Sequence, residues 1–167
     1  MKVGEACEPG VEIGPLIDAA AVRHALEQVE DAARRGARVL CGGRPLDRKG
    51  FFFEPTVLAD VPADALCLRE ETFAPIAPVT AFDTEAEAIR LANDTAHGLS
   101  AYAFTRDIGR VFRLAERLEA GMIGINDGLP TTSNAPFGGL KQSGWGRELG
   151  CEGLEAFLET KHLSITV

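Results

Sequence analysis

The chain has 167 residues, of which 46% are apolar and 25% charged, and its formal net charge is −8. These values are typical of a folded globular domain and exclude an intrinsically disordered chain. No basic stripe accompanies the acidic excess, so we expect no nucleic-acid partner. No apolar run approaches the roughly 18 residues that a membrane-spanning helix needs, so we expect no membrane partner either.

The first residues and the cysteines indicate a cytoplasmic protein. The start, MKVGEACEPG, contains no apolar core of the kind that a secretory signal carries. The four cysteines, Cys7, Cys41, Cys67 and Cys151, are widely spread and form no C-x-x-C pair. With three histidines they give no zinc pattern, so we expect reduced thiols in the cytoplasm and no metal site.

The first half of the chain combines one long helix with short extended segments. Apolar residues recur at helical spacing from Asp18 to Gly36, with Asp18 as the N-cap and Gly36 as the C-terminal stop. Extended segments are predicted at 38–41 and on both sides of Pro55. Another is predicted at 76–82, where prolines favour a sheet edge or a strand start.

Helices and strands alternate in the middle of the chain. The pattern from Thr84 to Glu87 is a capping box, which predicts a helix that ends before Gly98. A strand at 101–104, a helix that opens at Asp107 and a buried strand at 121–125 follow. This alternation with short links predicts a parallel α/β layer.

The last part begins with a long segment that lacks periodicity. Residues 126–147 hold five glycines and two prolines, and so long a loop in a compact domain is often functional. A helix is predicted at about 148–158. The tail alternates polar and apolar residues from His162 to Val167, which predicts a half-buried strand at the end of the chain.

Common catalytic and phosphate-binding motifs are missing from the glycine-rich loop. Trp145 follows Gly144 where a Walker motif needs lysine, and neither the dinucleotide pattern nor G-x-S-x-G is present. His24, His97 and His162 have no nearby acid or nucleophile pattern, so we expect them in solvated or capping roles.

Two segments carry a more specific pattern. Residues 69–75 read R-E-E-T-F-A-P, and residues 136–148 read P-F-G-G-L-K-Q-S-G-W-G-R-E. In this order and at this separation they resemble the aldehyde dehydrogenase superfamily, as do residues 12–16 and 121–126. The resemblance covers about residues 8–167 and corresponds to the C-terminal portion of the family.

The finer resemblance is to the NAD(P)-dependent succinate-semialdehyde dehydrogenases. It rests on the loop 128–136 and on residues 141–144, K-Q-S-G. It implies an α/β fold in which residues 1–158 form part of the catalytic domain, a parallel αβα layer. Residues 159–167 would be a C-terminal oligomerisation strand that adds to a sheet across a subunit boundary.

The resemblance implies oxidation of an aldehyde, in particular succinic semialdehyde, to the acid with NAD or NADP as cofactor. In that family a cysteine thiolate attacks the aldehyde, hydride passes to NAD(P)+, and water hydrolyses the thioester. The family's nucleophilic cysteine and general-base glutamate both lie upstream of the matched portion. We therefore expect no catalytic residue in this chain and little or no activity from the chain alone.

Two residues of the first segment are the candidate cofactor contacts. Glu71 matches the glutamate that accepts hydrogen bonds from the nicotinamide ribose hydroxyls, and two carboxylate oxygens suit a vicinal diol. Phe73 matches the aromatic that packs against the nicotinamide and holds it for hydride transfer. Without the motif, they would be a solvated acid and a core aromatic. Ala74 stands where the family usually has glycine, so its Cβ would restrict a tight backbone turn.

The candidate substrate contacts lie in the long loop. Phe137 matches an aromatic of the family's substrate tunnel, and its alternative role is a core aromatic that closes the loop. Thr131 stands where succinate-semialdehyde dehydrogenases place a hydroxyl that binds the distal carboxylate of the substrate. Thr132 and Ser133 are alternatives for that hydroxyl.

Two further hypotheses remain open at this point. In the first, the chain is a non-catalytic interaction module that binds a full-length relative or a separate N-terminal partner. In the second, the chain is a truncated gene product. Expected partners are thus a small aldehyde, a further copy of the chain in a homo-oligomer, or a missing N-terminal half. The choice between NAD and NADP stays open, because in this family it is made outside the matched portion.

Overall fold

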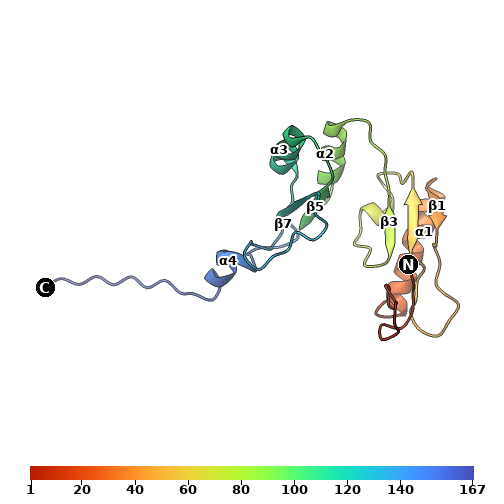
Figure 1. Ribbon diagram of the computed structural model, residues 1–167, viewed down its shortest axis with the longest axis horizontal. Helices are drawn as coiled ribbons and strands as arrows, with labels where there is room; N and C mark the ends of the chain where they lie inside the picture. The colour runs from red at the N-terminus through yellow and green to blue at the C-terminus, as the bar shows by residue number, and fades with distance from the viewer. The chain divides into compact units, whose positions relative to one another are not determined.

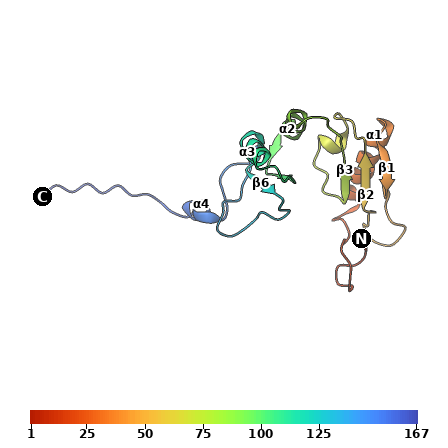
Figure 2. The ribbon, with the colours of Figure 1, turned by 45° about the horizontal axis from the view of Figure 1, so that its top comes forward.

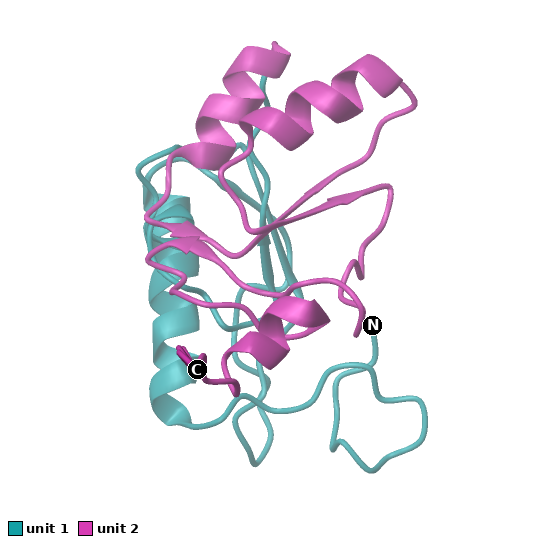
Figure 3. Cartoon of the chain, turned by 90° about the vertical axis from the view of Figure 1, so that its left-hand side faces the viewer, with its two compact units in different colours: residues 1–82 teal, residues 83–167 magenta.

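A computed structural model describes residues 1–167, which form two compact units, Met1–Phe82 and Asp83–Val167 (Figure 3). Both units mix helices with short strands (Figure 1), so the predicted α/β class is confirmed at this coarse level. None of the helices is long and apolar enough to cross a membrane. The predicted boundary after residue 158 divides part of the catalytic domain from an oligomerisation strand. It stays a prediction, because it concerns contact with another subunit.

The first unit is organised by the helix α1 (Ala19–Arg34). The Asp18 carboxylate accepts a hydrogen bond of 2.8 Å from the Ala21 amide, which confirms the predicted N-cap. Gly36 follows the helix with φ +104°, a left-handed conformation that glycine adopts without strain.

Three short strands form the sheet of the first unit (Figure 2). Their order is β1 (Arg38–Cys41), β2 (Thr56–Ala59) and β3 (Ile76–Pro78). β1 pairs antiparallel with β2, and β3 pairs parallel with β2 and lies at the sheet edge, where Pro78 is tolerated. The predicted extended segment before Pro55 contributes one isolated bridge, between Pro45 and Phe53.

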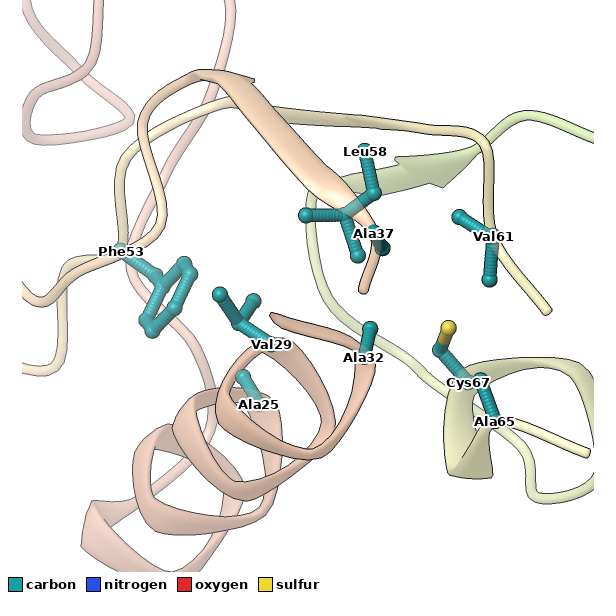
Figure 4. Packing of buried hydrophobic residues seen from close by; sticks show 9 residues of the cluster. All are labelled: Ala25, Val29, Ala32, Ala37, Phe53, Leu58, Val61, Ala65 and Cys67. Atoms are coloured by element: carbon teal, nitrogen blue, oxygen red, sulfur yellow. The ribbon is translucent and has the colours of Figure 1, made fainter. Parts of the chain in front are cut away.

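The core of the first unit lies between α1, the sheet and the short 3-10 helix η1 (Leu66–Leu68). Figure 4 shows nine side chains of this cluster. From α1 come small residues one and two turns apart, Ala25, Val29 and Ala32, which leave room for Phe53. The helix therefore packs closely on the sheet because its inner face is small.

The second unit contains three helices and four strands. They are α2 (Glu85–Asn93), β4 (His97–Gly98), β5 (Ser100–Ala103), α3 (Ile108–Arg117), β6 (Met122–Ile125), β7 (Leu140–Lys141) and α4 (Gly150–Glu155). β5 and β6 pair in parallel with α3 as the crossover, so part of the predicted parallel layer is present. β4 and β7 pair antiparallel and thereby hold the long loop.

Side chains cap the N-termini of the two longer helices of this unit, α2 and α3, as their sequences predict. The Thr84 hydroxyl accepts from the Glu87 amide at 3.2 Å, and the Asp107 carboxylate accepts from the Arg110 amide at 3.1 Å. The Glu87 carboxylate accepts from the Asp83 amide at 3.0 Å, one residue before the donor of an ideal capping box.

Three elements differ from their predictions. The strand predicted to be buried at 121–125 is β6, in which only Gly124 is buried. The predicted helix 148–158 is reduced to the six residues of α4, since Leu149 has φ +59° and offers no side-chain cap. Residues 160–167 have no secondary structure and are exposed, so their predicted pairing across a subunit boundary stays a prediction.

Candidate functional site

The segment that carries Glu71 and Phe73 runs from η1 to β3 and is anchored at both ends. At its start, the amides of Arg69 and Glu70 donate to the Leu66 carbonyl at 2.9 and 2.8 Å. At its end, the Pro75 carbonyl accepts from the Thr56 amide at 2.8 Å. The backbone is therefore held while the side chains of Glu71 and Phe73 are exposed.

Glu71 is tied to α1 through its main chain and not through its carboxylate. Its carbonyl lies 3.1 Å from Nε2 of His24, and the same nitrogen lies 3.0 Å from Nε2 of Gln28. His24, for which we expected a solvated or capping role, is half-buried and contacts the predicted cofactor segment. The carboxylate of Glu71 remains exposed and free to accept two hydrogen bonds from a diol.

Phe73 combines an exposed ring with a strained backbone. Its side chain is 84% exposed and its φ is +43°, a conformation that costs a residue with a Cβ roughly 1–2 kcal/mol. Ala74 has no positive φ and packs against the core, so it is Phe73 and not Ala74 that takes the unusual turn. The alanine that replaces the family's usual glycine is thus accommodated.

The long loop of the second unit presents Thr131 and Phe137. The amide and carbonyl of Phe137 both pair with Glu148, each at 2.7 Å, and the ring is half-buried. Thr131 is exposed. Of the two alternative residues, Thr132 donates its hydroxyl to the side-chain oxygen of Asn134, and Ser133 accepts the Gly150 amide at its carbonyl.

Polar groups elsewhere in the unit fix this loop. The Lys141 ammonium donates to the carbonyls of Asn93 and Thr95 at 2.9 and 3.1 Å, at the C-terminal end of α2. The Ser143 hydroxyl accepts the Gly98 amide at 2.9 Å, and the Arg147 guanidinium donates to the Gly139 carbonyl at 3.0 Å. Sequence analysis missed these anchors, because each joins side chains to main-chain groups that leave no pattern in the sequence.

Backbone contact explains one glycine of this region. A Cβ on Gly121 would lie 1.8 Å from the carbonyl oxygen of Gly138, so the loop touches the start of β6 directly. Any other residue at Gly121 would displace the loop that carries Phe137.

The acidic, histidine and cysteine side chains form no metal cluster, and the one buried thiol, Cys67, is not activated. No group of three or more histidine, cysteine, aspartate or glutamate side chains could hold a metal ion. All four cysteines are free, and burial raises the pKa of the Cys67 thiol, which favours the unreactive protonated form. The predicted site residues thus form two pairs, Glu71 with Phe73 in one unit and Thr131 with Phe137 in the other.

Known proteins similar to the chain include curated semialdehyde dehydrogenases. The glutarate-semialdehyde dehydrogenase of Pseudomonas aeruginosa is 52% identical over 165 residues, which are 99% of this chain and 34% of that protein. The succinate-semialdehyde dehydrogenase [NADP(+)] GabD of Escherichia coli is 50% identical over 165 residues, with the same two shares. The chain therefore spans about a third of the length of these relatives.

Solved structures similar to the chain are likewise about three times its length. The crystal structure of an E. coli NADP dependent enzyme superposes with a TM-score of 0.93 at 51% identity, over 95% of this chain and 33% of that one. The succinate-semialdehyde dehydrogenase from Burkholderia pseudomallei gives 0.90 at 50% identity, over 93% and 32%. Residues 1–163 match the aldehyde dehydrogenase family. The predicted family is confirmed, and the chain belongs to the aldehyde dehydrogenase family.

Proposed function

We propose that the chain is the part of an NAD(P)+-dependent aldehyde dehydrogenase that holds the nicotinamide ribose and one end of an anionic semialdehyde. The observation that carries the proposal is the anchored segment 69–75, which presents the Glu71 carboxylate and the Phe73 ring to solvent. Three relatives, 46–52% identical, are named for succinate or glutarate semialdehyde. Both substrates carry an aldehyde at one end and a carboxylate at the other.

The pair of residues in the first unit, Glu71 and Phe73, fits a ribose and its attached ring. Glu71 offers two oxygens, which suit the two adjacent ribose hydroxyls, and Phe73 offers an apolar face two residues further along. When bound, NAD(P)+ supplies the acceptor for hydride. The chain's contribution is to orient that acceptor and restrict its movement. We assign no residue of the chain to the cofactor's phosphates or adenine.

The proposed substrate contacts lie in the long loop of the second unit. The exposed hydroxyl of Thr131 would donate to the distal carboxylate, while the hydroxyl of Thr132 is engaged with Asn134. Phe137, fixed by its pairing with Glu148, would contact the carbon chain of the substrate. We assign no nucleophile and no general base to the chain, so oxidation requires groups from outside it.

A chimera with the E. coli relative tests the proposal. The 165-residue segment of GabD that matches this chain is replaced by the chain itself, and oxidation of succinic and glutaric semialdehydes is measured with NADP+ and NAD+. We expect turnover by the chimera and none by the isolated chain. A chimera that folds and binds NADP+ yet oxidises neither aldehyde contradicts the proposed substrate class.

Single substitutions in the chimera test the proposed cofactor contacts and the proposed substrate contacts separately. Glu71→Gln should raise the KM for NADP+ about 10-fold or more, because hydrogen bonds to a charged group are lost. Glu70→Gln, an exposed glutamate one position earlier, is the matched control and should change little. Thr131→Ala should raise the KM for the aldehyde and leave that for NADP+ unchanged, and Thr131→Ser should restore it. Equal effects of Glu70→Gln and Glu71→Gln would refute the cofactor assignment.

The exposed tail favours a second candidate function, an interaction module of cytoplasmic location. Leu163, Ile165 and Val167 are 72–120% exposed and alternate with polar residues, the pattern of a strand that adds to the edge of another sheet. Sedimentation of the chain, alone and mixed with full-length GabD, tests this against a version that ends at Leu158. A monomer that binds nothing, with or without the tail, would exclude the interaction module.

A further inference from the structure

One contact of the first unit joins α1 to the middle of the segment 69–75, which carries the proposed cofactor contacts. Nε2 of His24 lies 3.1 Å from the carbonyl oxygen of Glu71, a residue 47 positions away in the sequence. The segment's other main-chain anchors lie at its two ends, at Leu66 and Thr56. His24 therefore holds the backbone at the residue whose carboxylate we propose binds the ribose.

The proton on the imidazole follows from the identity of its partner. The Glu71 carbonyl only accepts hydrogen bonds, so His24 bonds to it only when Nε2 carries a proton. Both the imidazolium and the Nε2–H tautomer meet this condition. The Nδ1–H tautomer would instead place a lone pair against the carbonyl oxygen at 3.1 Å, which is repulsive.

Gln28 supplies the second observation. It lies one turn after His24 on α1, its side chain is fully buried, and its Oε1 has no hydrogen-bond partner. Its Nε2 faces Nε2 of His24 at 3.0 Å, and two N–H groups cannot bond to each other. Rotation of the amide by 180° brings Oε1 to the imidazole proton and gives that buried oxygen a donor.

We propose that His24, protonated at Nε2, is a positioning residue for Glu71, and that Gln28 fixes the imidazole by accepting the same proton. The inference rests on the proposed role of Glu71 in cofactor binding. The tether fixes the main chain from which the Glu71 side chain projects and supports the backbone two residues before the strained Phe73. Glu71 lies on a surface segment, and the tether restricts the movement of its main chain there.

Nitrogen NMR of the full chain tests the tether itself. Two-bond proton–nitrogen spectra of the imidazoles should show Nε2 of His24 protonated at neutral pH. In His24→Ala, amide hydrogen exchange should accelerate within residues 70–74 and stay unchanged in β1 and β2. Arg23→Ala, at the exposed neighbouring position on α1, is the matched control and should leave exchange unaltered. An Nε2 that carries a lone pair would overturn the proposal.

Kinetics of the GabD chimera test the consequence for the cofactor. His24→Ala should raise the KM for NADP+ about fivefold, the effect of one hydrogen bond, and leave kcat and the KM for the aldehyde nearly unchanged. His24→Gln should restore the KM, because its amide N–H reaches the position of Nε2. Should His24→Ala fail to fold, the comparison of His24→Gln with His24→Met gives the same test.

The two proposals fail in different ways. An effect of Glu71→Gln without any effect of His24→Ala would refute the positioning role and leave the ribose assignment intact. No effect of Glu71→Gln would refute the ribose assignment, while the NMR result would still decide whether the tether exists. Equal changes in the KM values for NADP+ and aldehyde in His24→Ala would indicate general damage and also refute the positioning role.

Discussion

Phe73→Ala should weaken cofactor binding and lower the stability of the chain only slightly. The ring is 84% exposed, so its removal takes little apolar surface out of the folded interior. About a sixth of a phenylalanine's surface of ~200 Å² is ~30 Å², which at ~25 cal/mol per Å² amounts to about 0.8 kcal/mol. We therefore expect the free energy of unfolding to fall by less than about 1 kcal/mol.

Phe53→Ala is the matched control, since the same substitution is made in the same unit. The Phe53 ring is 1% exposed and packs against α1 in the core. Its removal leaves a cavity as well as lost transfer free energy, and the expected cost is about 3–5 kcal/mol. The contrast between the two variants depends only on burial.

Phe73→Gly separates the ring from the backbone strain. Glycine relieves a left-handed conformation that costs roughly 1–2 kcal/mol and adds roughly 0.5–1 kcal/mol of backbone entropy, so it should be as stable as the alanine variant or slightly more. Urea denaturation of the three variants gives the free energies, and fluorescence titration of the GabD chimera with NADPH gives cofactor affinity. A loss of more than about 2 kcal/mol in Phe73→Ala would show that the ring is packed and refute its proposed role.

Three further predictions concern polar groups. Thr56→Val should lower the free energy of unfolding by about 1–3 kcal/mol, because the buried hydroxyl accepts the Gly43 amide and donates to the Glu54 carbonyl; Thr56→Ser should lose less. The Leu66 amide and Arg35 hold the pKa of Asp31 below its ordinary value of 3.8. The contribution of the Asp31 carboxylate to the free energy of unfolding is therefore complete above pH 3.8 and is lost as the pH falls through the lower pKa of the folded state. Urea midpoints of Asp31→Asn should lack this acid-dependent loss. Arg113 and Arg110 lower the pKa of Glu85 from 4.5 to about 2, so stability should decline from about pH 4.5 to 2, and Glu85→Gln should reduce that decline in acid titrations followed by circular dichroism.

The helices α1, α2 and α3 were predictable because their determinants are local. Asp18, Thr84 and Asp107 each sit directly before an amphipathic run, and each accepts an amide of the first helical turn. The parallel pairing of β5 with β6 also followed from sequence, since a helix of ten residues separates them and such crossovers join parallel neighbours.

Strand partners over longer distances were beyond prediction from local pattern. β3 pairs with β2, and residues 162–167 alternate as a strand does but have no neighbouring strand in this chain. Alternation records that one face is to be buried and does not identify the partner that buries it. The tail therefore has the alternating pattern of a paired strand although its apolar side chains are exposed in this chain.

Anchors of the candidate site were hidden for a related reason. The pattern 69–75 identified Glu71 and Phe73, but not His24, which acts on a main-chain carbonyl that every residue possesses. Lys141 likewise binds the carbonyls of Asn93 and Thr95 at the end of α2. Side chains that bond to carbonyls place no demand on the residue type of their partner, so no motif reports them.

The proposed contacts of each unit, taken separately, share one arrangement, in which main-chain groups are held and one or two side chains are left exposed. Glu71 has its carbonyl bound and its carboxylate free, and Thr131 is exposed beside two neighbours whose polar groups are engaged. Holding the backbone limits the entropy that a ligand must remove when it orders these side chains. A chain with such held contacts is suited to positioning reactants, while we propose that the covalent chemistry requires groups from outside it.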